Sequence, residues 1–286
     1  MPNVSEGRDP AVVAAIGAAF STSARLLDVH SDADHHRSVL TLVGEDEPLV
    51  ESLLAGVAKT VELVDLREHL GVHPRVGAAD VVPLVPLAPD DMELAAAAAL
   101  ALAARIGDEL GLPVFLYGEV GSGRRPAFFR RGGLDMLRRR VEAEELVPDA
   151  GPLELDPRSG AVLVGARQAL IAYNLDLATD DVEVAEAVAR AVRESSGGMP
   201  GVQAIGLQLG SGRVQVSTNV IDVDQAPLHE LVARVRSEAS ARGVDVAAGE
   251  LVGLVPERVL RAAEAAGVTL PGIDESRVLE HALGQH

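Results

Sequence analysis

The stretch of sequence best equipped for chemistry is an irregular segment, residues 71–83, that reads GVHPRVGAADVVP. It brings a histidine, an arginine and an aspartate (His73, Arg75 and Asp80) close together between two glycines and two prolines. Pro74 restricts the backbone of His73 to extended conformations, and the glycines permit tight bends or the close approach of a ligand. An imidazole suits proton transfer because its ordinary pKa lies near neutrality. We interpret His73 as a candidate general acid–base, although a histidine that merely hydrogen-bonds a turn fits the pattern equally well.

Two further segments are candidate site components. Residues 148–160 contain too much proline and glycine for a helix or a central strand, and such a loop can offer backbone N–H and C=O groups to a heterocyclic ligand. A plain connector explains the same composition. Tyr117 and Glu119 lie at the end of an apolar run that we predict to be a buried strand, where α/β sheets often carry functional side chains. The polar residues of segment 215–219 face either solvent or a cleft.

Several other kinds of site are disfavoured. The chain has no cysteine, so it has neither a thiolate nucleophile nor a disulfide or Cys-based zinc site. The Gly-Ser-Gly sequences at 121–123 and 210–212 lack the ending of a nucleotide-binding loop and are interpreted as turns. His35 and His36, beside Asp32 and Asp34, would hold a metal only loosely, because neighbours on a strand diverge and no third ligand is evident. We therefore predict a polar hairpin tip and no metal.

The net charge of the chain disfavours some classes of binding partner. The 286-residue chain has a formal net charge of −18, which repels nucleic acid and anionic membrane surfaces. Its densest basic run, Arg138–Arg140, is followed at once by glutamates and is interpreted as a solvated helix face. The N-terminal residues do not resemble a secretory signal, and the longest uncharged apolar stretch, residues 94–104, is too short for a membrane span. We expect a cytoplasmic protein with small-molecule substrates, and neither nucleic acid nor membrane as a partner.

The elements that must position these residues are clearest in the second half. Apolar spacing and glycine stops predict strand 170–177, helix 181–195, strands 202–209 and 214–220, helix 227–242 and strand 244–255. This order is the β-α-β-β-α-β arrangement of ferredoxin-like domains. The predicted fold class is therefore α/β of the α+β kind.

The first half repeats this order less regularly. We predict a strand at residues 2–4, helix 10–20, strands 26–29 and 39–43 around a polar turn, helix 48–64 and an extended segment 81–87, followed by helix 90–110 and strand 113–117. We expect two packed ferredoxin-like subdomains, residues 1–168 and 169–286, with a ligand groove between them.

Six ordered motifs make the chain resemble the glutamate formimidoyltransferase family. They are PNVSEGR at 2–8, HPRVGAAD at 73–80, LYGE at 116–119, PDAGP at 148–152, GAR at 165–167 and QVSTN at 215–219. The resemblance runs from residue 2 to about Pro256. It implies a homodimer in which formimidoyl groups pass between N-formimidoyl-L-glutamate and tetrahydrofolate, a co-substrate, giving 5-formimidoyltetrahydrofolate and glutamate in histidine breakdown. No metal is implied.

The resemblance also carries over residue roles. His73 matches the family's catalytic histidine, and the family's folate-binding segment matches Gly151, Pro152, Leu153, Glu154, Leu155, Asp156, Pro157, Arg158, Ser159 and Gly160. Supporting candidates are Arg75, Asp80, Tyr117 and Glu119. An arginine cluster, such as Arg75, Arg158 and Arg167, is expected to compensate the carboxylates of folate.

Two departures from the family pattern stand out. His30 and His36 occupy positions where the family usually has Asp and Asn, so the hairpin around them is assigned no role. The cyclodeaminase domain that follows in the vertebrate enzyme is not expected here. The alternatives are a related folate-dependent formyl or one-carbon transferase and a catalytically silent folate-binding protein.

Overall fold

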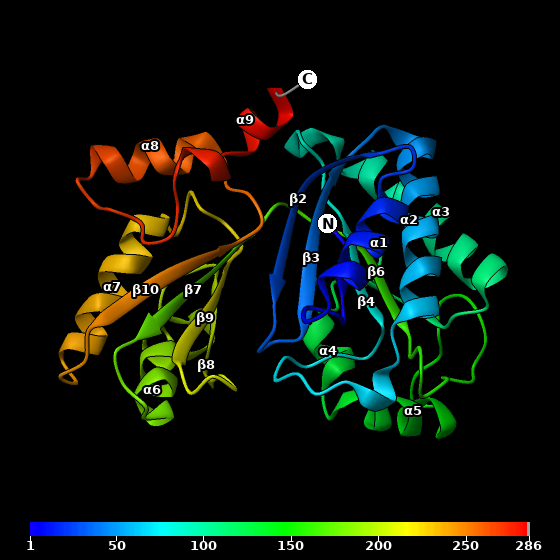
Figure 1. Ribbon diagram of the computed structural model, residues 1–286, viewed down its shortest axis with the longest axis horizontal. Helices are drawn as coiled ribbons and strands as arrows, with labels where there is room; N and C mark the ends of the chain where they lie inside the picture. The colour runs from blue at the N-terminus through cyan, green and yellow to red at the C-terminus, as the bar shows by residue number, and fades with distance from the viewer. Residues whose placement is uncertain (285–286) are drawn as a thin grey trace. The chain divides into compact units, whose positions relative to one another are not determined.

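The computed structural model describes residues 1–284, and the chain divides into two compact units, Met1–Gln168 and Ala169–His286. Each unit is built on one sheet with its own helices and its own apolar core. In Figure 1 the first unit runs from blue to green along the chain and the second from green to red. Among the described residues, no helix is both long enough and apolar enough to cross a membrane.

The second unit has the predicted β-α-β-β-α-β order, which confirms its predicted fold. Its elements are β7 (Ile171–Leu177), α6 (Val182–Val192), β8 (Val202–Gln208), β9 (Val214–Val220), α7 (Leu228–Ser240) and β10 (Val246–Val252). The sheet is antiparallel with the strand order β10-β7-β9-β8. The helices α8 (Glu257–Ala265) and α9 (Leu279–Gly284) follow, and η3 (Glu194–Ser196) and η4 (Glu275–Arg277) are short 3₁₀ turns.

Alternation explains which face of this sheet is covered. Tyr173 and Leu175 of β7 are fully buried against the helices, because alternate residues of a strand point to the same face. Helix α6 begins where the Asp181 carboxylate accepts a hydrogen bond from the Glu183 amide at 2.9 Å, which satisfies a free N–H of its first turn. The core of this unit is aliphatic apart from Tyr173, as the composition requires.

The first unit starts with the same arrangement and then extends it. Its elements are β1 (Asn3–Val4), α1 (Pro10–Phe20), β2 (Arg25–Asp32), β3 (Arg37–Val43), α2 (Asp46–Leu63), β4 (Ala79–Leu84), α3 (Met92–Leu110), β5 (Val114–Gly118), α4 (Pro126–Arg130), α5 (Gly133–Glu142) and β6 (Val162–Ala166), with the 3₁₀ turns η1 (Leu66–Glu68) and η2 (Pro89–Asp91). The strand order is β2-β3-β1-β4-β6-β5, in which β6 pairs in parallel with β4 and β5. The first four positions repeat the strand order of the second unit.

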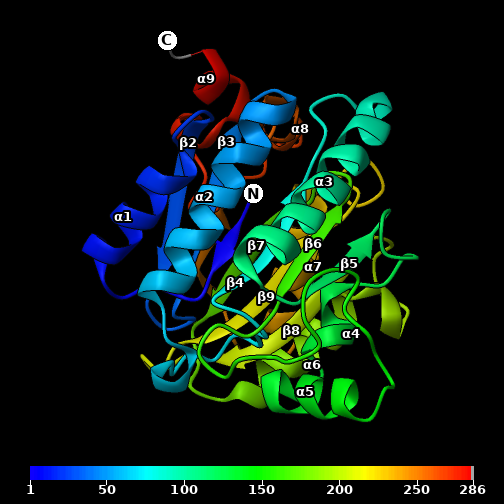
Figure 2. The ribbon, with the colours of Figure 1, turned by 90° about the vertical axis from the view of Figure 1, so that its right-hand side faces the viewer.

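Helices cover both faces of this sheet. On one face of the sheet, Val82 and Val164 pack with α1, α2 and α3, which are seen in Figure 2. On the other face, Leu163 and Phe115 pack with α4 and α5. The sequence patterns did not predict β6, whose five residues are all buried. A strand covered on both faces is a short continuous apolar run without alternation, so it gives no periodic signal.

Candidate active site

His73 lies in a loop, residues 69–78, that joins η1 to β4 and packs against the turn between β2 and β3. The loop closes on itself because the Arg75 guanidinium donates to the carbonyls of His69 at 2.7 Å and Gly71 at 3.3 Å. Gly71 lies so close to the hairpin that a Cβ atom there would sit 2.3 Å from the carbonyl oxygen of His35. The predicted need for glycine in this segment therefore has a physical cause, which is close backbone approach.

The β2–β3 turn brings two more histidines to the loop. The rings of His35 and His73 meet edge to face with centroids 6.0 Å apart, and His36 stacks on His69 at 4.1 Å. The Nε2 atom of His69 donates to the backbone carbonyl of His36 at 2.7 Å. Within the described part of the chain, no group of three histidine or carboxylate side chains is arranged to hold a metal ion. The histidines of the β2–β3 turn therefore pack against the His73 loop.

Asp80 organises the charges beside His73. Its side chain is fully buried, and its Oδ2 atom accepts hydrogen bonds from Arg37 at 2.8 Å and from Arg130. Its Oδ1 atom accepts the backbone N–H of Val76 at 2.7 Å, which fixes the C-terminal part of the loop. Burial would raise the pKa of Asp80, but the charges of Arg130 and Arg37 outweigh burial and hold the pKa well below its ordinary value.

His73 itself is held in the neutral form. Burial is the main cause, and the nearby Arg37 and Arg130 guanidiniums add to it, lowering the pKa of His73 to about 2. The pKa of His73 in the ligand-free chain therefore lies below the ordinary histidine value from which its role was predicted. The Nδ1 atom is buried and makes no hydrogen bond among the described residues. A neutral imidazole is in the protonation state that can accept a proton, although this lowered pKa makes it a weak base while the pocket is empty.

A pocket of about 410 Å³ opens beside the His73 ring. Arg75 and Arg130 line it together with His73, and the backbone of Gly132 and Gly133 forms another part of its wall. The pocket therefore combines a neutral proton acceptor with two cationic side chains. This combination suits binding of an anion next to a proton-transfer group.

The second irregular segment joins the first by backbone pairing. Gly160 and Gly77 form an antiparallel bridge, the Ala78 amide donates to Ser159 at 2.9 Å and the Ala161 amide donates to Val76 at 2.9 Å. Segment 151–160 is therefore anchored to the C-terminal part of the His73 loop itself.

The middle of this segment is exposed at the surface. The backbone groups from Pro152 to Leu155 make no hydrogen bond within the described residues. Leu153 is 63% exposed, while Leu155 is buried in the core beneath α5. One side chain thus anchors the segment and its neighbours stay accessible.

The remaining candidates are more dispersed. Tyr117 is buried, and burial raises its pKa to about 12 although Arg167 bonds to its hydroxyl. Glu119 is exposed. Arg158 donates to the Glu62 carbonyl at 2.7 Å and lies 3.8 Å from Asp65.

Of the three arginines of the expected cluster, Arg75 is the one that lines the pocket beside His73. Arg158 and Arg167 have the other partners just described, whereas Arg75 lines the pocket with Arg130, and Arg37 lies behind them on Asp80. Sequence reasoning missed Arg37 and Arg130 because nothing near them in the chain marks them. One lies at the start of β3 and the other ends the short helix α4.

In the second unit, the polar residues of β9 divide between the two sheet faces. Gln215 is fully buried and donates to Asp176 Oδ1 at 2.9 Å, and Arg213 donates to the other oxygen of Asp176 at 2.6 Å. Thr218 lies on the opposite face and donates to the carbonyl of Tyr173. The alternation along β9 thus makes one polar row and one core row.

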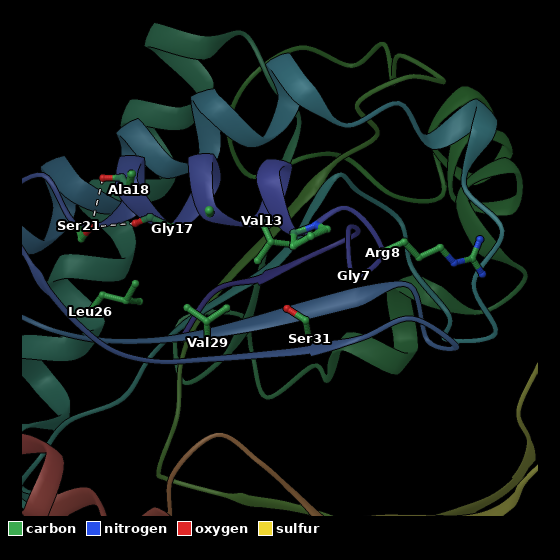
Figure 3. Close-up of a pocket in the computed structure, with 11 residues that line it drawn as sticks. Gly7, Arg8, Val13, Gly17, Ala18, Ser21, Leu26, Val29 and Ser31 are labelled. Atoms are coloured by element: carbon green, nitrogen blue, oxygen red, sulfur yellow. Dashed lines mark hydrogen bonds between the residues drawn. The ribbon is translucent and has the colours of Figure 1, made fainter. Parts of the chain in front are cut away.

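A larger pocket of about 610 Å³ lies between α1 and β2. Its wall is mostly apolar, with Val13, Leu26 and Val29 around the space shown in Figure 3. The guanidinium of Arg8 points away from these side chains and donates to the carbonyls of Ala33 and Leu70. The described residues that line this pocket include no histidine or carboxylate, so the smaller pocket is the better candidate for chemistry.

Comparisons with known proteins agree over both units. Residues 1–167 match the model of the formiminotransferase domain, N-terminal subdomain, and residues 172–267 match the model of the formiminotransferase domain. A glutamate formimidoyltransferase of Thermoplasma acidophilum is 37% identical over 290 residues, which cover 98% of this chain and 95% of that protein. A glutamate formimidoyltransferase of Streptococcus pyogenes serotype M1 is 36% identical, with 91% of this chain and 89% of that protein covered. A formimidoyltransferase-cyclodeaminase of Gallus gallus is 40% identical over 91% of this chain, which spans 50% of that longer protein.

Proposed function

The chain belongs to the formiminotransferase family, and from this premise we propose that it transfers a formimidoyl group between N-formimidoyl-L-glutamate and tetrahydrofolate. Tetrahydrofolate is the co-substrate and 5-formimidoyltetrahydrofolate and L-glutamate are the products. The observation that carries the proposal is the neutral His73 on the wall of a pocket. In the family motif, this residue occupies the position of the catalytic histidine.

Formimidoyl transfer requires one proton acceptor that later becomes a donor. The N5 amine of tetrahydrofolate attacks the formimidoyl carbon, forming a C–N bond while the π electron pair of the C=N bond moves to the imino nitrogen, and the proton of the amine passes to His73. The C=N bond of the tetrahedral intermediate then re-forms as the bond to the glutamate nitrogen breaks, and His73 returns the proton to that nitrogen. A neutral imidazole is in the correct state for the first step. Once protonated beside Arg37 and Arg130, it is a strong acid, which favours the second step.

The segment 151–160 is the proposed folate-binding segment. Its unpaired backbone groups and the exposed Leu153 can meet the hydrogen-bonding edge and the apolar face of a pterin. Its anchoring to residues 76–78 keeps it beside the His73 loop. On this proposal the reaction serves histidine breakdown, where formimidoylglutamate arises.

Mass spectrometry of the products tests the function directly. Purified protein is incubated with tetrahydrofolate and either N-formimidoyl-L-glutamate or N-formyl-L-glutamate. We expect glutamate and 5-formimidoyltetrahydrofolate from the first donor and little turnover of the second. Preference for the formyl donor would identify a formyltransferase instead. Folate binding without product from either donor would identify a catalytically silent binding protein.

The same assay tests the role of His73. We expect His73→Ala to lower kcat by about 10²–10⁴, the usual contribution of a general acid–base, while folate affinity and the fold persist. The loss should fall mainly on kcat, because the proton is needed in the transition state. A mutant with near-normal kcat but weaker folding and folate binding would make His73 a structural residue.

A further inference from the structure

The charges around the His73 loop do not balance among the described residues. Three guanidiniums, those of Arg37, Arg75 and Arg130, lie near one buried carboxylate, Asp80. Arg75 donates only to two backbone carbonyls and forms no ion pair with a described residue. Two carboxylates of the neighbouring segments have partners of their own: Glu6 Oε1 lies 3.2 Å from His36 Nε2, and Asp32 Oδ1 accepts the backbone N–H of His35 at 2.7 Å. Excess positive charge in a chain with a net charge of −18 is unusual, and it is costly where solvent is excluded.

The excess charge borders the pocket beside His73. Arg75 and Arg130 both line this pocket, and the Nε atom of Arg130 is buried without a hydrogen-bond partner in the described chain. One terminal nitrogen of the Arg130 guanidinium already donates to the Asp80 carboxylate. Gly132 and Gly133, which also line the pocket, present backbone without side chains, and a Cβ atom on Gly133 would meet nothing within 4 Å. The pocket is therefore open, cationic and short of one or two acceptor groups.

We propose that Arg75 and Arg130 form a carboxylate subsite that binds a glutamyl group of the substrates and holds the reacting carbon against His73. The identity of the ligand as a glutamyl carboxylate rests on the proposed function. The subsite itself rests on the pocket and its charges. Guanidiniums bind carboxylates through paired, charge-assisted hydrogen bonds, which fix orientation as well as position. The glutamyl group of the formimidoyl donor and the glutamyl tail of the folate have the same chemistry.

Anion binding here would also act on His73. A carboxylate placed between the two arginines offsets the positive field of Arg130 at the imidazole ring. The imidazole then accepts a proton more readily when substrate is present than when the pocket is empty. Substrate binding and proton acceptance are coupled through this subsite.

Direct binding of glutarate tests the subsite, because glutarate is a dicarboxylate with no transferable group. Isothermal titration compares wild-type protein with Arg75→Met, Arg130→Lys and the control Arg131→Met, which removes an exposed arginine next to the pocket. We expect glutarate affinity to fall about 10- to 100-fold in Arg75→Met and Arg130→Lys, the effect of losing a charge-assisted hydrogen bond. Affinity should be unchanged in Arg131→Met, and the uncharged diamide of glutarate should not bind.

Two variants keep the test valid if one fails to fold. Arg130→Lys retains the positive charge facing Asp80, and Arg75→Met removes no ion pair between described residues. Circular dichroism at the temperature of the titration checks each fold. The proposal is overturned if wild-type protein does not bind glutarate, or if folded forms of both variants bind it normally.

Kinetics with two folates separate the sources of the carboxylate. A KM for formimidoylglutamate that rises in the variants with both tetrahydrofolate and tetrahydropteroate, which lacks the glutamyl tail, assigns the subsite to the donor. A KM for tetrahydrofolate that rises in the variants, with no change for tetrahydropteroate, assigns it to the folate tail. Glutarate binding through Arg75 without formimidoyl transfer would refute the proposed function and keep the subsite. Formimidoyl transfer by a protein whose variants bind glutarate normally would keep the proposed function and refute the subsite.

Discussion

At the scale of single residues, Asp80 holds the site in its present form. Its carboxylate accepts hydrogen bonds from two arginines and from the amide of Val76, so it fixes both the charges beside His73 and the chain that follows. It is enclosed completely by protein. Among the described residues, Arg37 and Arg130 form ion pairs with Asp80 and with no other carboxylate.

We expect Asp80→Asn to lower the free energy of unfolding by about 3–5 kcal/mol, the cost of breaking a buried ion pair by removing one partner. Urea denaturation measures this difference. Asp108→Asn, at an exposed position of α3, is the control and should change stability by less than about 0.5 kcal/mol. Equal effects from the two substitutions would contradict the central role of the Asp80 carboxylate.

The pKa of His73 makes a prediction about catalysis. The pH dependence of kcat/KM reports groups of the free protein, and the lowered pKa keeps His73 neutral throughout the range from about pH 5 to 8. We therefore expect no limb from His73 in kcat/KM over this range. Comparison of the profiles of wild-type protein and His73→Gln provides the measurement. The ordinary pKa of histidine is about 6.5. A limb near this pH in the wild-type profile that is absent from the mutant profile would show that His73 titrates normally.

His69 makes a prediction about stability in acid. Burial lowers its pKa from 6.5 to about 4, so the folded chain binds this proton less readily than the unfolded chain. The contribution of His69 is complete above pH 6.5 and is lost as the pH falls towards 4, on the order of 2 kcal/mol in total. In His69→Gln, whose amide can still donate to the His36 carbonyl, stability should fall less between pH 7 and 4.5. Denaturant titrations at both pH values test this, and parallel losses in the two proteins would contradict it.

At the scale of elements, the βαββαβ order of the first unit places the loop before β4 beside the turn between β2 and β3. In the strand order β2-β3-β1-β4, the two-residue strand β1 is all that separates β3 from β4. Arg37 at the start of β3 can therefore reach Asp80 in β4 across the short β1. The added helix α4 supplies Arg130 from beyond this arrangement.

The junction between the two irregular segments makes a prediction about packing. A Cβ atom on Gly77 would lie 1.9 Å from the carbonyl oxygen of Ala161, so Gly77→Ala forces the paired backbones apart. We expect a loss of about 1–3 kcal/mol, the usual cost of overpacking, together with weaker folate binding. Denaturation and folate titration measure the two effects.

Gly17→Ala is the matched control for this substitution. A Cβ atom at this position of helix α1 makes ordinary contacts at 3.6 Å with the side chains of Leu26 and Leu40, so the change should be neutral or stabilising by up to about 1 kcal/mol. If Gly77→Ala behaved in the same way, the close junction between the two segments would be refuted.

At the scale of the whole molecule, the proposed transfer needs no metal, because proton transfer by His73 accounts for both steps. We expect dialysis against a chelator to leave activity and thermal stability unchanged. Activity assays before and after dialysis, with added Zn²⁺ or Mg²⁺ as the comparison, provide the measurement. Loss of activity that one divalent ion restores would require a metal in the mechanism.

We also propose that the protein is a homodimer, as the family resemblance implies. Light scattering on a sizing column should give twice the chain mass of 29.7 kDa. A mass equal to that of one chain at assay concentrations would exclude a dimer as the working form.

The sequence by itself determined most of the elements and their order. Helix 10–20 and strand 214–220 have the predicted limits, and the β-α-β-β-α-β order of residues 170–255 is confirmed. These features depend on spacing within short windows, which local backbone periodicity makes visible. The His73 loop was visible for a similar reason, because proline and glycine mark an irregular backbone in the sequence.

Only the tertiary structure decided the electrostatics of the site. Arg37, Asp80 and Arg130 are far apart in the chain, and strand pairing and the packing of α4 bring them together. The same packing sets the pKa of His73, because both its burial and the charges of neighbouring side chains depend on the folded surroundings. A residue type gives only the ordinary pKa. The fold around it sets the protonation state in which it works.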